Sequence, residues 1–279
     1  DKIVDTVLHK RYAEKQRVEP IRGRLAAVAL GMHTGEALGQ HRETPEASAT
    51  NHEIGRILQA YHKADGATDK GLRDIVDVRE DLLSQSGLLM SVDNGATFFH
   101  LSIQEFLAAE RLFVLNEGRH DEVVKLFLDR GQSAGWRNTL AFHFGCLVAA
   151  FKPSAGIERL CHLARCIELP PLDIPHRLQA HPVWHQVIAL GDALQILAGQ
   201  GVTIPDELTN FFQRCVFRAI EQEIPAKDRQ TLAAALGRLG DPRIELDLRV
   251  PTGPERHAGY IKIPASTYLI GEEKQAIAI

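Results

Sequence analysis

Several features that would narrow the function are missing from this sequence of 279 residues. No apolar run approaches the roughly 20 residues that a membrane-spanning helix needs, so we expect no membrane partner. The formal net charge is only −4, which gives no general attraction to nucleic acid or to anionic membranes. Aromatic residues make up 6% and hydrophobic residues 44%. Leu and Ala dominate the hydrophobic set, which favours helices.

Cysteine is also scarce. The spacing of Cys161 and Cys166 matches neither C-x-x-C nor a zinc pattern. We therefore predict reduced thiols within the core of a cytoplasmic protein. All four cysteines lie in apolar stretches that favour helices, at Cys146, Cys161, Cys166 and Cys215.

Motifs for catalysis and metal binding are absent too. The sequence contains no G-x-x-x-x-G-K-[ST], no G-x-S-x-G and no H-E-x-x-H. His176, His181 and His185 do not share one helical face, and Pro182 interrupts them, so we predict no metal site. We expect that this chain alone is not an enzyme.

A hairpin is the clearest local feature that is present. The apolar runs Leu88–Val92 and Ala96–His100 flank Asp93-Asn94-Gly95, and Asn-Gly between such runs is a strong hairpin signal. Upstream, residues 74–83 have the spacing of an amphipathic helix that stops near Gly87. Together with a helix after the hairpin, this order is the outline of a winged-helix module.

The helix after the hairpin has a candidate functional residue at its start. Ser102 and Glu105 have the S-x-x-E spacing of a capping box, which predicts that the helix begins at Ser102. His100 stands just before this cap, where free N–H groups and the helix dipole favour anions. From the residues alone, His100 is either a ligand contact or an ordinary polar surface residue.

These residues resemble a known motif. Ser86-Gly87-Leu88-Leu89, followed by Phe99-His100-Leu101-Ser102-Ile103-Gln104-Glu105-Phe106-Leu107-Ala108-Ala109, is similar to the winged-helix motif of NACHT-type STAND nucleotide switches. That motif runs approximately S-G-L-L, a hairpin, then F-x-H-x-S-F-Q-E-[FY]-x-A-A, and Ile103 replaces the usual aromatic residue. The resemblance implies that His100 contacts the terminal phosphate of ADP in the closed form, with Ser102 at the helix start nearby.

The same resemblance implies cofactors and partners. A longer bacterial protein would bind ATP or ADP with Mg²⁺ in a nucleotide-binding domain that precedes this chain, and it would form a homo-oligomer on activation. Antiviral defence is a role that fits the family.

The N-terminal part gives weaker signals. We predict helices over residues 2–14 and 21–32, and a loop over the polar stretch 33–48. Thr50 to Glu53 can cap the next helix, which continues through Tyr61.

The C-terminal part is expected to be a helical arm. Thr231–Arg243 resembles a HEAT-like unit, and pairs of helices fit a short solenoid. Tyr260–Gly271 resembles the opening strand pair of the formylglycine-generating-enzyme family, whose fold also serves as a C-type-lectin-like binding module. Only about the first twenty residues of that domain would be present, so no oxidase activity is carried over. The other predicted helices are 121–130, 136–151, 156–167, 183–198 and 206–223.

We therefore predict a mainly α fold: a winged-helix module with a small β-hairpin, an α-helical arm and a short β segment at the C-terminus. The favoured function is a regulatory segment of a STAND ATPase that holds the ADP-bound off state and couples a C-terminal sensor to nucleotide exchange. Two alternatives are a winged-helix DNA-binding regulator, which the acidic wing disfavours, and a helical extension of a formylglycine-generating-type enzyme. We predict five divisions of the chain. Residues 1–19 end a helical domain, 20–116 form the winged-helix domain and 117–225 form a helical domain. Residues 226–255 hold the HEAT-like unit and a linker, and 256–279 begin the formylglycine-generating-enzyme-like domain.

Overall fold

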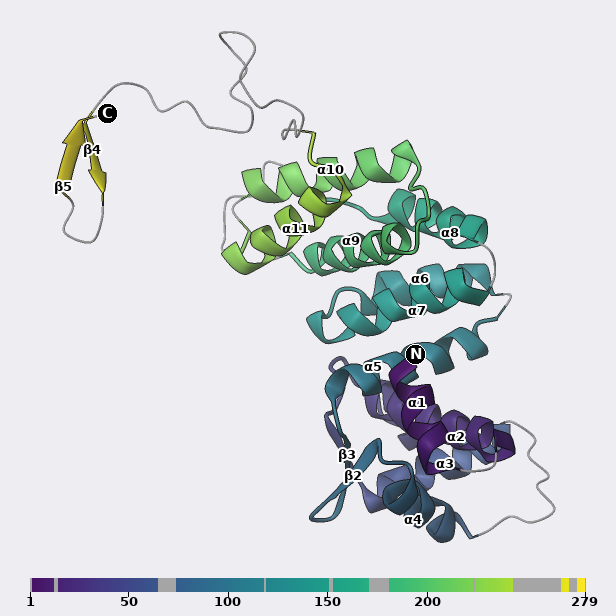
Figure 1. Cartoon of the computed structure of the whole chain (residues 1–279). Helices are drawn as coiled ribbons and strands as arrows, with labels where there is room; N and C mark the ends of the chain where they lie inside the picture. Colours follow the sequence, from purple (N-terminus) through teal and green to yellow (C-terminus); the bar gives the residue numbers. More distant parts are fainter. Residues whose placement is uncertain are drawn as a thin grey trace. The chain divides into compact units, whose positions relative to one another are not determined.

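The computed structural model shows a mainly helical chain with a small three-stranded antiparallel sheet (Figure 1). Contacts divide the chain into two compact units, 1–239 and 240–279, and each is described by itself. The finer divisions at residues 19, 116, 225 and 255 stay predictions. The structure describes residues 2–12, 15–64, 74–117, 119–150, 153–170, 181–222, 224–242, 267–270 and 275–278.

The first unit supplies all eleven α-helices of the described residues. The predicted helix 74–83 is confirmed as α4, and the five predicted between residues 121 and 223 are confirmed as α6 to α10. Near the N-terminus α1 ends earlier than predicted, while α2 begins earlier and ends later. The bounds are α1 (Lys2–Arg11), α2 (Lys15–Thr34), α3 (Asn51–Ala64), α4 (Ile75–Gln85), α5 (Leu101–Leu115), α6 (His120–Arg130), α7 (Arg137–Ala150), α8 (Pro153–Cys166), α9 (Val183–Gly199), α10 (Asp206–Glu221) and α11 (Ala226–Leu239).

The predicted hairpin is confirmed as β2 (Leu89–Val92) and β3 (Gly95–Phe98). Val92 pairs with Gly95, so Asp93 and Asn94 form the turn and Gly95 already belongs to the strand. The predicted loop 33–48 was wrong at both ends: α2 continues to Thr34, and residue 48 begins a third strand, β1 (Ser48–Thr50), on the far side of β3. A short 3₁₀ helix, η1 (Glu36–Leu38), also lies in this stretch.

Gly95 is required by the third strand. A Cβ at this position would lie 2.1 Å from the carbonyl oxygen of Ala49, a backbone atom of β1 that cannot rotate away. We expect Gly95→Ala to lower the free energy of unfolding by about 3 kcal/mol, measured by urea denaturation. Gly237→Ala is the matched control, because its Cβ would meet nothing within 4 Å and alanine should stabilise the helix by about 0.5 kcal/mol. Equal stability of the two variants would contradict this role.

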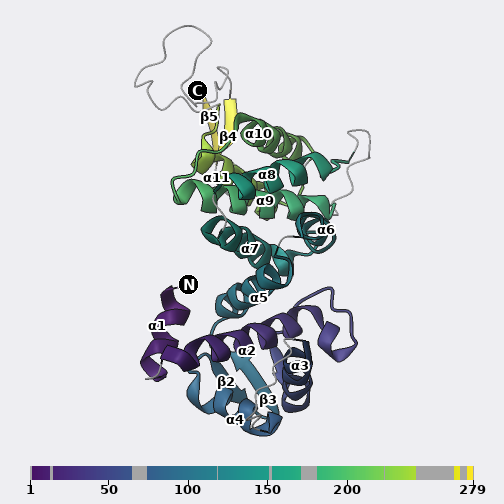
Figure 2. The same ribbon diagram turned by 90° about the vertical axis from the view of Figure 1, so that its right-hand side faces the viewer.

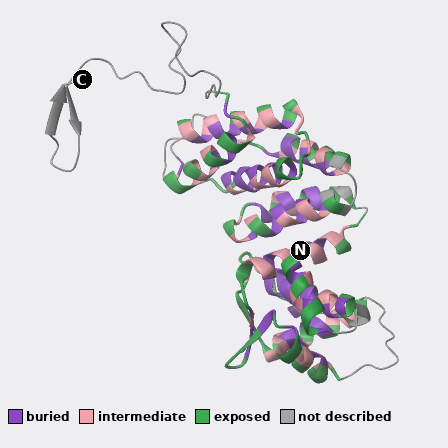
Figure 3. Ribbon diagram, in the orientation of Figure 1, coloured by how far each residue is buried: buried purple, intermediate pink, exposed green. Residues whose placement is uncertain are grey.

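Two hydrophobic cores share one helix. The first core is built from α1 to α4 and the sheet, and the second from α6 to α11. Helix α5 contributes Leu107 and Ala108 to the first core and Leu112 to the second. It packs against α2 on one side and α7 on the other, as Figures 1 and 2 show. Figure 3 colours the residues by burial, and those of the two cores are buried. Helix α5 therefore belongs to both hydrophobic cores.

The second unit contributes a hairpin of β4 (Thr267–Ile270) and β5 (Gln275–Ala278), paired antiparallel with Thr267 opposite Ala278. The predicted strand pair over 260–271 lies only partly within the described residues, because 260–266 and 271 fall outside them. His176 of the histidine group and Arg243 at the end of the predicted HEAT-like unit also lie outside the described residues. In the described residues, no helix combines the length and apolar character needed to cross a membrane.

Candidate functional site

His100 is the N-cap of α5. Its backbone is extended, with φ −146° and ψ 138°, and its Nδ1 accepts a hydrogen bond from the N–H of Ser102 at 3.2 Å. The predicted Ser102–Glu105 capping box is therefore wrong, and the helix begins one residue earlier, at Leu101. Nδ1 is bonded to Cγ just as the capping oxygen of Asp is, which places an acceptor at the same reach as in a common N-cap residue.

This capping contact orients the imidazole. Because Nδ1 accepts a backbone N–H, the neutral ring carries its proton on Nε2. The hydroxyl of Ser102 lies 2.6 Å from the same Nδ1. The His100 side chain is exposed, so an acceptor arriving from outside can take the remaining N–H. The structure thus brings the two predicted site residues together, with His100 outermost.

Ser102 is already occupied by local contacts. Its N–H and its hydroxyl both meet Nδ1 of His100, and the next N–H, of Ile103, donates to the carbonyl of His100 at 3.0 Å. These N–H groups are therefore not open to a ligand. In this geometry the role that fits Ser102 is to hold the ring of His100, and direct contact of Ser102 with a phosphate stays a prediction.

The neighbours of His100 are exposed and apolar. Phe99 is 66% exposed and Leu101 is 52% exposed. Large apolar side chains exposed side by side typically mark a surface that another protein surface covers. His100 is therefore flanked in the sequence by two exposed side chains that favour contact with another protein surface.

Glu105, the residue expected to close the capping box, faces α7 instead. It is buried, and both carboxylate oxygens lie 3.1 Å from Nδ2 of Asn138 in the first turn of α7. Burial raises the pKa of the Glu105 carboxyl, and the hydrogen bond from Asn138 opposes this effect. The contact joins the helix that His100 caps to α7.

Three more side chains complete a polar junction between the two cores. It comprises His33, Gln104, Glu105, Asn138 and Thr139, of which all but the exposed Asn138 are buried. Nε2 of His33 lies 2.9 Å from the Thr139 hydroxyl, and Nδ1 of His33 lies 3.1 Å from the carbonyl of Ala29. Gln104 donates to the carbonyl of Glu46 at 2.8 Å. The sequence analysis placed His33 in a loop and identified no contact of Gln104 with Glu46.

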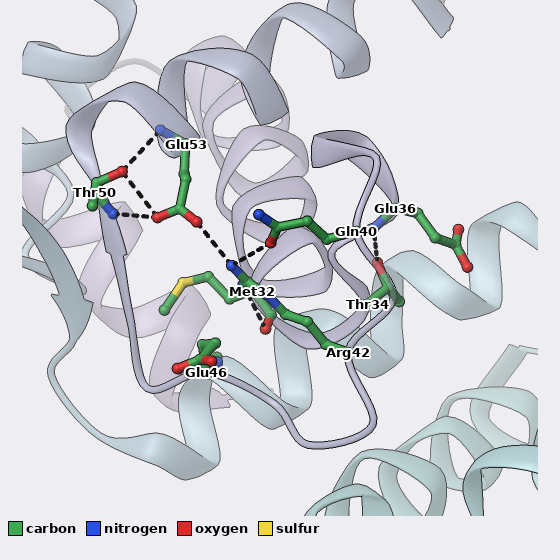
Figure 4. Close-up of polar contacts among 9 residues, drawn as sticks. Met32, Thr34, Glu36, Gln40, Arg42, Glu46, Thr50 and Glu53 are labelled. Atoms are coloured by element: carbon green, nitrogen blue, oxygen red, sulfur yellow. Dashed lines mark hydrogen bonds and ion pairs between the residues drawn. The ribbon is translucent and has the colours of Figure 1, made fainter.

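A network around Arg42 fixes the loop that supplies the Glu46 carbonyl, as Figure 4 shows. Arg42 donates to the carbonyl of Met32 at 3.3 Å and to Glu53 at 2.8 Å. Glu53 also accepts the Thr50 N–H at 2.8 Å, and the Thr50 hydroxyl accepts the Glu53 N–H at 3.2 Å. The predicted cap at Thr50 is thus confirmed as a reciprocal capping box. The Thr50 N–H is the main cause that lowers the pKa of Glu53.

Neither of two cavities in the first unit includes His100. A cavity of about 530 Å³ lies between α5, α7 and α9, and its lining is mainly apolar, with Phe106, Phe142 and Cys146 among its residues. A cavity of about 340 Å³ is polar and includes His41 and Arg130.

The two most strongly shifted cysteine thiols, Cys146 and Cys215, are not activated as nucleophiles. All four cysteines are free, but the predicted core position holds fully for Cys215 alone, because Cys146, Cys161 and Cys166 are half-buried. Burial raises the pKa of Cys146 to about 11 and that of Cys215 to about 12, so both thiols are protonated at neutral pH. Within the described ranges, no three His, Cys, Asp or Glu side chains gather as a metal site requires.

Comparison with known proteins adds no relative. No family model matches the sequence, and no curated protein or solved structure matches the chain.

Proposed function

We propose that this chain is the regulatory segment of a bacterial NACHT-type STAND ATPase, and that it holds the ADP-bound off state. The observation that carries the proposal is the exposed His100 at the N-cap of α5, within the sequence pattern of that family. The succession of α4, the β2–β3 hairpin and α5 supports a winged-helix module within residues 20–116. Helices α6 to α11 would form the helical arm, with α11 as its HEAT-like unit.

The surroundings of His100 support a contact with a nucleotide-binding domain. Phe99 and Leu101 would pack against that domain, which would bring Nε2 of His100 to the terminal phosphate of ADP. A hydrogen bond to a charged group contributes about 1.5–3 kcal/mol. Exchange of ADP for ATP with Mg²⁺, prompted by a C-terminal sensor, would break this contact and permit oligomerisation. A cytoplasmic role in antiviral defence fits the proposal.

Helix α5 would connect the contact between His100 and the phosphate with the proposed helical arm. Its first turn carries His100 and Ser102, its second turn holds Asn138 of α7 through Glu105, and its third contributes Leu112 to the second core. A ligand can shift such an equilibrium only through different affinities for the two states. His100 supplies that difference if it meets the phosphate in the closed state alone.

Replacing His100 tests this role. In the longer protein with its nucleotide-binding domain, we expect His100→Ala to speed release of a fluorescent ADP analogue by roughly tenfold or more, because one charge-assisted hydrogen bond is lost. Stopped-flow fluorescence measures the rate. His52→Ala is the matched control, since His52 is also an exposed histidine in the first turn of a helix, α3. Equal release rates in both variants would refute the proposed phosphate contact.

The DNA-binding alternative is less well supported. A winged helix that reads DNA needs Lys or Arg on the wing, and Leu89–Phe98 has neither. The outward side chains of this wing include exposed Met90 and Val92. Their chemistry favours a protein surface over a phosphate backbone.

A further inference from the structure

Strand β2 is an open edge of the sheet. The strand order is β1-β3-β2, so β2 pairs on one side only. The register and the bond from the Phe99 N–H to the Leu88 carbonyl make Leu88, Met90 and Val92 the residues whose backbone groups face β3. The N–H and C=O of Ser91 and the C=O of Leu89 therefore point away from β3. Among the described residues, no hydrogen bond is made to these outward groups of Ser91.

Strand β2 is only four residues long, but it lacks the side chains that usually protect an edge strand. Natural edge strands carry Lys, Pro or a bulge that prevents pairing with another chain. Strand β2 reads Leu-Met-Ser-Val, with no charge and no proline. Its side chains on the outer face are apolar and open to solvent, with Met90 41% and Val92 44% exposed. Figure 3 shows most of this strand as exposed.

We propose that β2 pairs antiparallel with β2 of a second copy of this chain, centred on Ser91. The partial charges along the edge are self-complementary, because each Ser91 N–H can donate to the Ser91 carbonyl of the other copy. In this register Met90 of one copy faces Val92 of the other, on both sides of the centre. Two strongly exposed apolar side chains per copy then lose contact with water. The Leu89 N–H takes no part in the pairing, because it donates to the Ser86 hydroxyl at 3.3 Å.

This surface is separate from the contact proposed for His100. The pairing uses the outer edge of β2, whereas His100 lies beyond the end of β3 at the start of α5. The pairing needs no nucleotide, so the two proposals can fail independently.

Introducing a charged side chain at Ser91 tests the proposal. The mass of the 279-residue chain is measured by sedimentation equilibrium over a range of concentrations. We expect a concentration-dependent dimer for the wild type. Ser91→Lys and Ser91→Asp should each be monomeric, because like charges then face one another across the centre. An equimolar mixture of the two variants should form a heterodimer.

Ser48→Lys is the matched control. Ser48 is exposed on β1, the opposite edge of the same sheet, and this variant should dimerise like the wild type. Circular dichroism and a thermal melt establish that each variant is folded. A wild type that stays monomeric throughout overturns the proposal. So does a dimer that the Ser91 variants leave unchanged, or a mixture that stays monomeric.

Discussion

Lowering the pH from 7 to 5 is expected to reduce the free energy of unfolding by several kcal/mol, because two histidines are buried in their neutral form. His33 and His143 have almost no exposed surface, and burial lowers the pKa of each to about 4. An unfolded histidine titrates near 6.5. Acid therefore protonates the unfolded chain first, and stability is lost as the pH falls from about 6.5 towards 4.

The magnitude follows from the two pKa values. Between pH 7 and 5 each histidine contributes a loss of about 2 kcal/mol. Glu105 opposes this effect, because burial raises its folded pKa. Its protonation favours the folded state as the pH falls from that raised value to the ordinary value of a free glutamate.

Urea denaturation at a series of pH values measures how the free energy of unfolding changes with pH. Two variants show which histidine causes the change. We expect His33→Gln and His143→Gln each to remove about half of the histidine contribution, whatever their stability at pH 7, since glutamine does not titrate. If both variants keep the full pH dependence of the wild type, these histidines are not the buried neutral groups described above.

Trp136→Ala is expected to lower the free energy of unfolding by about 4 kcal/mol. Trp136 is fully buried in the short helix η2 (Ala134–Trp136), which precedes α7. The edge of His33 meets its ring at 5.4 Å between centroids, and the Arg130 guanidinium lies 5.4 Å from the ring centroid. Truncation would leave a cavity beside the polar junction and remove the packing on both neighbours.

Trp136→Phe separates packing from hydrogen bonding. Among the residues that the structure describes, the indole N–H has no hydrogen-bond partner, so phenylalanine loses volume but no bond within them. We expect Trp136→Phe to cost about 1 kcal/mol, measured by urea denaturation followed by circular dichroism. Similar losses for the Ala and Phe variants would contradict a role in packing.

Local patterns predicted much of this fold. The Asp93-Asn94-Gly95 stretch predicted the hairpin, and apolar periodicity located helices α6 to α10. These signals depend on neighbours within one turn or one pair of strands. The cap at Thr50 was found for the same reason, because both partners lie within four residues.

Contacts between distant residues were not predictable in this way. Strand β1 has only three residues, and it forms because Ala49 reaches Ala96 of β3. His33 is buried because it meets Thr139, which is 106 residues away. Nothing in the polar sequence around His33 indicates that distant partner, so the sequence suggested a loop.

The same difference between local and long-range contacts applies to the candidate site. The motif identified His100 and the start of a helix, but it assigned the cap to Ser102 and Glu105. A histidine is not among the preferred capping residues, so the local pattern favoured serine. The turn of Glu105 towards Asn138, 33 residues ahead, requires the packing of α5 on α7.

The nucleotide content of the longer protein tests the central proposal most directly. The purified protein is denatured, and the released nucleotide is identified and quantified by chromatography. We expect ADP from the wild type and from His52→Ala, and strongly reduced ADP from His100→Ala. Absence of nucleotide from the wild type, or equal ADP from all three proteins, would contradict the proposal that His100 retains ADP in the off state.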